Sequence, residues 1–200
     1  MNAASRTAES AEPMSEPVAP VRQTAEEVLA FWRAAGADRW FEHDAAFDAA
    51  IRGRFAATYE DAAAGLRSDW ENQPESALAL VIVLDQFPRN MFRNSARAYE
   101  SDPLARAVAE RAVARGFDRQ VAMPERNFFY LPFEHSESLA DQERAVTLIR
   151  QTGDADLLKW ADLHADIIRR FGRFPHRNGV LGRPTTPEEQ AFLDGGGFAG

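Results

Sequence analysis

The chain has 200 residues, of which 45% are hydrophobic and 27% are charged, and this length suits one globular domain with a full core. It contains no cysteine, which excludes disulfides, thiolate nucleophiles and thiolate metal sites and fits a reducing cytoplasm. Its formal net charge of -8 argues against general binding to nucleic acid, and no apolar run approaches the roughly 20 residues that span a bilayer.

Residues 1–22 are predicted to form a disordered tail. They hold alanine, serine, glutamate and proline without an aromatic residue or an apolar period, so burial cannot offset the entropy lost on ordering. They also lack the basic start and the apolar stretch of a secretory signal. We therefore expect a cytoplasmic protein.

Residues 23–194 are predicted to form a single all-helical domain. Thr24 and Glu27 have the spacing of a capping box, and the first helix then continues to about Gly36. Large apolar side chains four residues apart predict a second amphipathic helix over residues 44–64. The further helices expected are residues 74–85, 102–114, 124–136, 138–151 and 154–171, and a short one that begins near Thr186.

Short connections join these helices, and no convincing β-hairpin signal interrupts them. The pattern predicts an all-α fold of antiparallel helix pairs. Residues 195–200, with the sequence GGGFAG, are predicted to be a flexible C-terminus. The oligomeric state is left open, because periodicity does not separate a dimer face from a core face.

Three sequence blocks carry a family resemblance: LDQFPRNMFR at residues 84–93, FFYLPFEHSE at residues 128–137 and RFGRFPHRN at residues 170–178. With them the chain resembles, over about residues 25–192, the bacterial family catalogued as domain of unknown function 924. The resemblance implies a tetratricopeptide-like α-α superhelix. It implies no reaction, because that family has no established biochemical activity.

Two histidines are expected to point inward. His164 lies on the apolar face of residues 154–171, and His135 lies on the apolar face of a helix that includes residues 131–149 if that helix is continuous. Each is either a core histidine hydrogen-bonded to a neighbour or a general base beside a carboxylate of shifted pKa. A metal site would add ligands from Glu134, Glu137, Asp141 or Asp85, but their spacing matches no metal-binding motif, so neither a metal nor a cofactor is predicted.

Arginines set among aromatic side chains form a larger constellation, although all but one of the 23 basic residues are arginine. Partly desolvated guanidinium groups need anionic partners. If nearby acids are those partners, the array is an internal ion-pair network; if arginines outnumber the acids, they bind a carboxylate or phosphate. The candidate ligand-binding residues are Asp85, Arg89, Asn90, Arg93, Arg126, Tyr130, Glu134, His135, His164, Arg173 and Arg177.

The leading hypothesis is a binding module that holds an anionic small molecule or an acidic peptide end in an arginine-rich groove. The alternatives are an enzyme that uses a histidine–carboxylate pair on a small anionic substrate, and a purely structural polar core. Neither a nucleic acid nor a membrane is expected as a partner. One-to-one pairing of arginines with buried acids would favour the structural hypothesis, whereas an open pocket with surplus arginine would favour binding. A histidine and a carboxylate in mutual contact beside that opening would favour the enzyme.

Overall fold

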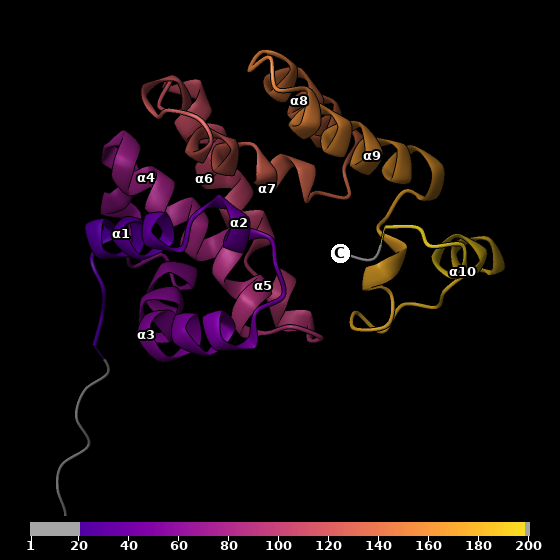
Figure 1. The fold of residues 1–200 in the computed structure, drawn as a ribbon, viewed down its shortest axis with the longest axis horizontal. Coiled ribbons are helices and arrows are strands. Elements are labelled where there is room, and N and C mark those ends of the chain that lie inside the picture. Colours follow the sequence, from indigo (N-terminus) through magenta and orange to yellow (C-terminus); the bar gives the residue numbers. More distant parts are fainter. Residues whose placement is uncertain (1–20, 199–200) are drawn as a thin grey trace, which may run out of the picture.

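The structure is a computed structural model that describes residues 21–198. All regular elements in this part of the chain are helical, and none of the described residues forms a strand (Figure 1). This confirms the predicted all-α class. The arrangement of these helices as a tetratricopeptide-like superhelix stays a prediction. The tail predicted at residues 1–22 lies outside the described residues, except for Val21 and Arg22.

The first helices begin where their capping residues predict. Thr24 Oγ1 accepts a hydrogen bond from the Glu27 amide (3.2 Å), and the Glu27 carboxylate accepts one from the Thr24 amide (2.8 Å). Asp44 caps the next long helix by accepting from two backbone amides. The N-terminal elements are α1 (Ala25–Ala35), α2 (Ala37–Trp40), α3 (Ala45–Ala63) and the 3₁₀ turn η1 (Ser68–Asn72).

The apolar helix predicted to end at residue 85 continues to Met91, so that prediction is wrong. It consists of α4 (Pro74–Val81), the π-turn η2 (Ile82–Gln86) and α5 (Phe87–Met91). Every side chain from residue 77 to residue 84 is at most 3% exposed, as a helix that is apolar all round requires. Asp85 lies in the π-turn, and turns of this kind are frequent at functional sites.

A proline explains the π-turn. Pro88 has no amide hydrogen, and its ring would clash with the carbonyl of Leu84 four residues earlier. The helix widens here, and the Phe87 amide donates to the carbonyl of Ile82, five residues earlier. The carbonyl of Leu84 instead accepts a hydrogen bond from Ser101 Oγ at 2.6 Å. The side chain of Ser101 therefore completes the hydrogen bonding of the widened turn.

Replacing Ser101 with alanine is expected to lower the free energy of unfolding by about 1–3 kcal/mol, because the buried Leu84 carbonyl would lose its partner. Urea unfolding followed by circular dichroism measures this loss. The control is Ser138→Ala at an exposed position without a side-chain cap bond, where we expect a change within about 0.5 kcal/mol. Equal losses in both variants would contradict the role of Ser101.

The helix predicted over residues 124–136 is two shorter pieces, so this prediction is also wrong. Pro132 lacks the amide hydrogen, and its ring would crowd the preceding turn of a helix that continued through it. Unlike at Pro88, no widened turn accommodates the proline here. The chain forms the 3₁₀ turn η5 and then begins a new helix, α7, with Pro132 in its first turn. The elements from residue 96 to residue 134 are η3 (Ala96–Tyr99), α6 (Asp102–Ala114), η4 (Asp118–Gln120), η5 (Glu125–Phe129) and α7 (Leu131–Glu134).

The C-terminal elements are α8 (Leu139–Arg150), α9 (Ala155–Phe171), the 3₁₀ turn η6 (Pro175–Arg177) and α10 (Pro187–Asp194). Helices α8 and α9 lie side by side, and α7 connects them to the helices of the N-terminal half (Figure 1). The main core includes Trp32, Phe55 and Phe87, whereas a smaller cluster of Ile167, Ile168 and Phe174 joins α9 to the segment that follows it.

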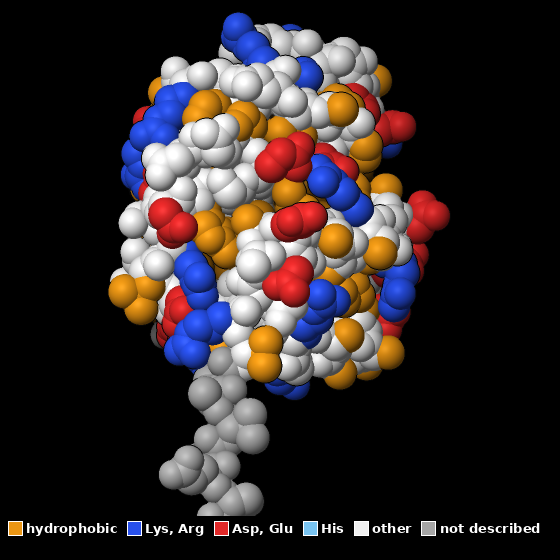
Figure 2. All heavy atoms as spheres, turned by 90° about the vertical axis from the view of Figure 1, so that its left-hand side faces the viewer, with side chains coloured by type: hydrophobic (Ala, Val, Ile, Leu, Met, Phe, Trp, Pro, Cys, Tyr) orange, Lys and Arg blue, Asp and Glu red, His pale blue; other side chains and the backbone are white. Residues whose placement is uncertain are grey.

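The face that carries α1, α3 and α4 has acidic and basic side chains interspersed with apolar ones (Figure 2). No helix within residues 21–198 has both the length and the apolar character that crossing a bilayer demands.

Candidate functional site

A histidine–carboxylate pair lies at the π-turn. Asp85 is 1% exposed, and its Oδ1 lies 2.9 Å from Nδ1 of His135, the residue that follows α7. The side-chain amide of Gln86 donates to the other oxygen of Asp85 at 2.5 Å. The π-turn therefore aims a buried carboxylate, held on both oxygens, at a histidine whose side chain remains 17% exposed.

Arg89 lies one turn further along the same helix. It donates to the backbone carbonyl of Asp85 and makes two hydrogen bonds to the carboxylate of Asp102, at 2.9 and 3.1 Å. Its guanidinium also lies 3.3 Å from Asp85 Oδ1. Arg89 is therefore a fully engaged cation that joins the π-turn to the start of α6.

Arg177 lies beside Arg89 but is less well satisfied. It is 7% exposed and reaches Asp102 only at 3.6 Å. Its guanidinium carbon lies 4.6 Å from the ring centroid of Tyr99 and 4.5 Å from that of Phe174. Its Nε is buried and has no hydrogen-bond partner. Two arginines therefore share one carboxylate, and only one of them binds it closely.

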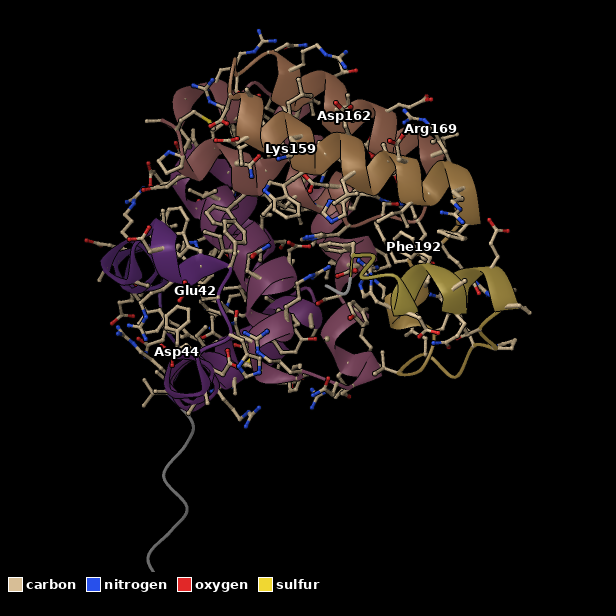
Figure 3. The ribbon with its side chains drawn as sticks, turned by 45° about the vertical axis from the view of Figure 1, so that its right-hand side comes forward. Glu42, Asp44, Lys159, Asp162, Arg169 and Phe192 are labelled. Carbon is tan, nitrogen blue, oxygen red and sulfur yellow. The ribbon has the colours of Figure 1, made fainter. Side chains whose placement is uncertain are left out.

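A second histidine–carboxylate pair adjoins the first. Glu134 precedes His135 in sequence, and its Oε1 is hydrogen-bonded to Nδ1 of His164 on α9. Both residues are buried. Helix α9 also carries Lys159, Asp162 and Arg169, which are spread along one of its sides (Figure 3).

His176 completes the group. Its Nδ1 is buried without a hydrogen-bond partner, and its ring centroid lies 5.6 Å from that of Phe174. The ring of Phe174 in turn meets His164 edge-on at 5.6 Å. We call the following residues the central cluster: Asp85, Arg89, Asp102, Glu134, His135, His164, His176 and Arg177.

The two arginines respond to this environment in opposite ways. Burial lowers the pKa of Arg89, but Asp102 and Asp85 outweigh burial and raise it above its ordinary value. Burial also lowers the pKa of Arg177, the charge of Arg89 adds to that effect, and the pKa stays below its ordinary value. Arg177 is therefore the incompletely compensated cation of the cluster.

The first pair contains a carboxylate and a neutral imidazole at neutral pH. Burial opposes ionisation of Asp85, but Arg89 and His135 bring the pKa of Asp85 down to about 2. Burial lowers the pKa of His135, and Arg89 lowers it further. Because an ionised carboxylate can only accept, Nδ1 of His135 carries the proton and Nε2 keeps a free lone pair. This arrangement suits acceptance of a hydrogen bond or a proton.

The structure brings six of the candidate residues together and separates the others. Asp85, Arg89, Glu134, His135, His164 and Arg177 are in the central cluster. Asn90 and Arg93 instead bind Asp48 of α3, at 2.8 Å for the amide nitrogen and 2.5 Å for Nε. These two residues therefore join α5 and the turn that follows it to α3.

Arg126 and Tyr130 line a separate pocket of about 120 Å³. The hydroxyl of Tyr130 donates to Asp118 at 2.8 Å, and Arg126 donates to the carbonyl of Val121 at 2.9 Å. Burial and then Asp118 raise the pKa of Tyr130. Arg173 is also apart, because it pairs with Glu189 of α10 through two hydrogen bonds at 2.6 and 2.9 Å.

Several residues that matter here were not among the candidates. The sequence around Asp102 predicts only the start of a helix. It does not predict that Asp102 is the carboxylate that the two arginines share. Gln86 lies next to Asp85 in the LDQFPRNMFR block, which is the signal that could have found it, whereas Tyr99 carries no sequence signal of its own. His176 was visible in the RFGRFPHRN block, and its position next to Arg177 is the signal that could have found it. Within residues 21–198, no group of three or more histidine, aspartate or glutamate side chains is arranged to hold a metal ion.

Comparisons with known proteins give the family. The sequence model described as bacterial protein of unknown function, DUF924, matches residues 28–197. A solved structure of a protein of unknown function from Agrobacterium tumefaciens is similar to this chain, with a TM-score of 0.83 and 48% sequence identity, and the match covers 86% of this chain and 97% of that chain. No curated protein matches. This chain therefore belongs to the DUF924 family of bacterial proteins.

Proposed function

We propose that the protein binds a small ligand, or an acidic peptide end, through an anionic group held at Arg177. The observation that carries the proposal is the buried guanidinium with an unpartnered Nε and a carboxylate no closer than 3.6 Å. A buried charge without close partners is costly, and a ligand carboxylate or phosphate would supply them. The flanking rings of Tyr99 and Phe174 fix the plane of the guanidinium, which favours recognition of a planar or tetrahedral acid group.

Neighbouring residues support the same role. Asp85 and Asp102 both contact Arg89, and Asp102 reaches Arg177 only at 3.6 Å. We also propose a cytoplasmic location, which the cysteine-free composition supports, and a tetratricopeptide-like superhelix, which the family resemblance supports.

Replacing Arg177 with methionine is expected to weaken binding of phosphate or a small carboxylate about 10- to 100-fold, because charge-assisted hydrogen bonds contribute about 1.5–3 kcal/mol. Isothermal titration calorimetry with phosphate, acetate and succinate measures the affinities. The matched control is Arg170→Met, since Arg170 is exposed and pairs with exposed Glu188. The control should bind as the unaltered protein does.

The structural hypothesis gives a different result. If the central cluster serves only packing, none of the acids binds the unaltered protein, and Arg177→Met changes stability alone. Binding that is equally weak in the Arg177 and Arg170 variants would also contradict the proposal, because it would place the anion elsewhere.

One observation favours a second candidate, an enzyme that acts on the bound acid. Asp85 orients His135 at 2.9 Å and leaves Nε2 as a base. Each small acid that binds would be incubated with the protein and followed by proton NMR. If it is converted, His135→Gln should lower the rate about 10²- to 10⁴-fold while affinity stays within about twofold. Affinity and rate falling together would assign His135 to binding instead.

A further inference from the structure

The glycine-rich segment after α10 makes a defined turn. The amide of Gly195 donates to the carbonyl of Ala191 at 3.1 Å, and the amide of Gly197 donates to that of Phe192 at 3.0 Å. Gly196 has φ +79°, in the left-handed region that favours glycine. A Cβ on Gly197 would lie 2.6 Å from the ring of Phe192. The glycines therefore permit a reversal that other residues would obstruct.

This reversal sends the chain from α10 back toward the middle of the molecule (Figure 1). Phe192 lies on α10 next to α9 (Figure 3), and its ring centroid is 5.1 Å from that of Phe171. Phe198 then reaches the central cluster. Its ring centroid lies 4.5 Å from that of His164 and 5.2 Å from that of His176, and both contacts are edge-on.

Phe198 therefore occupies a subsite made by His164, Phe174 and His176, and it is only partly buried against the small hydrophobic cluster there. This aromatic subsite adjoins the anion-binding group directly. The ring of Phe174 contacts His164, and its centroid also lies 4.5 Å from the guanidinium carbon of Arg177. His176 is the residue immediately before Arg177. An aromatic ring and an acid group on one small molecule would thus find adjacent partners.

Resting on the proposed function, we infer that the ligand is an aromatic acid, with a ring beside a carboxylate or phosphate, and that residues 195–198 compete with its ring for the aromatic subsite. A partly buried side chain on a glycine-rich turn is suited to displacement, because glycine loses much conformational freedom on ordering and such segments open at low cost. The segment then acts as a lid that the ligand replaces.

Phenyl phosphate and inorganic phosphate separate the two parts of the ligand. We expect phenyl phosphate to bind the Phe198→Ala variant about tenfold more tightly than it binds the unaltered protein, as removal of a competitor that fills the subsite about 90% of the time would give. The affinity for inorganic phosphate should be the same in both proteins. The control is Leu66→Ala, which removes an exposed apolar side chain from the connection between α3 and η1.

A second readout does not depend on a ligand. Diethyl pyrocarbonate modifies accessible histidines, and mass spectrometry locates the modified residue. Modification of His164 or His176 should become several-fold faster in Phe198→Ala, whereas exposed His43 should react at an unchanged rate. Unchanged rates at both His164 and His176 would overturn the inference that Phe198 covers them.

The outcomes distinguish the two proposals. If phosphate binds but phenyl phosphate gains nothing from Phe198→Ala, the aromatic-acid inference fails while the anion site stands. If phenyl phosphate binds the variant more weakly, Phe198 is part of the site wall and not a competitor, and the inference again fails. If neither compound binds either protein, the proposed function itself fails and the inference falls with it.

Discussion

Replacement of Asp85 with alanine is expected to lower the free energy of unfolding by about 3–5 kcal/mol, which is the usual cost of removing one partner from a buried ion pair. Asp85 is 1% exposed and has Arg89, His135 and Gln86 as side-chain partners. Its removal leaves His135 and Gln86 without their acceptor, and Arg89 keeps only the carboxylate of Asp102. Chemical denaturation in urea measures the loss.

Two further variants sharpen this test. Asp85→Asn keeps the size of the side chain and one acceptor oxygen, so we expect a smaller loss than for alanine. Asp166→Ala removes an exposed carboxylate that pairs with Arg169 one turn away, and a change within about 0.5 kcal/mol is expected. If Asp85→Ala is no more destabilising than Asp166→Ala, the ion pairs of the central cluster do not stabilise the fold.

Local sequence patterns predicted much of the secondary structure, because helix starts and helix faces follow from nearby residues. The capping box at Thr24 is present, and a second one at Thr186 opens α10. Helical periodicity placed His164 on the inner face of α9, where it is 7% exposed. The errors occurred at prolines. Pro88 widens a helix without ending it, since Ser101, distant in sequence, satisfies the carbonyl that Pro88 leaves free.

Arg89 and Asp85 lie one turn apart on one helix, so this contact was within reach of the sequence. The partners Asp48, Asp102 and Glu189 could not be predicted, because only packing brings them to the candidate arginines. Arg93 binds Asp48, 45 positions away, and thereby leaves the predicted site. Arg89 binds Asp102, whose sequence context marks only a helix start. Composition was a weak guide for Phe198 as well, since a glycine run that favours flexibility also permits the turn that carries its ring to His164.

The stability of the protein is expected to fall steeply as the pH drops from about 7 to about 5, and His176 is expected to cause much of the fall. Burial, with a further contribution from Arg177, lowers the pKa of His176 to about 3. In the unfolded chain its pKa is near the ordinary value of about 6.5. Between these values the unfolded state binds a proton that the folded state does not, so acid favours unfolding. The stability is fully present above the unfolded pKa and is lost progressively below it.

For a single histidine this linkage amounts to about 2 kcal/mol between pH 7 and pH 5. Urea unfolding at several pH values in this range measures the free energy of unfolding, which should therefore fall by about 2 kcal/mol less between pH 7 and pH 5 in His176→Gln than in the unaltered protein. His135, whose pKa is also lowered, contributes to the fall with the same sign, but its contribution is common to both proteins and cancels in the difference. His43→Gln, at an exposed position, serves as the control and should follow the unaltered protein. Parallel curves for all three proteins would mean that His176 is not held neutral in the folded state.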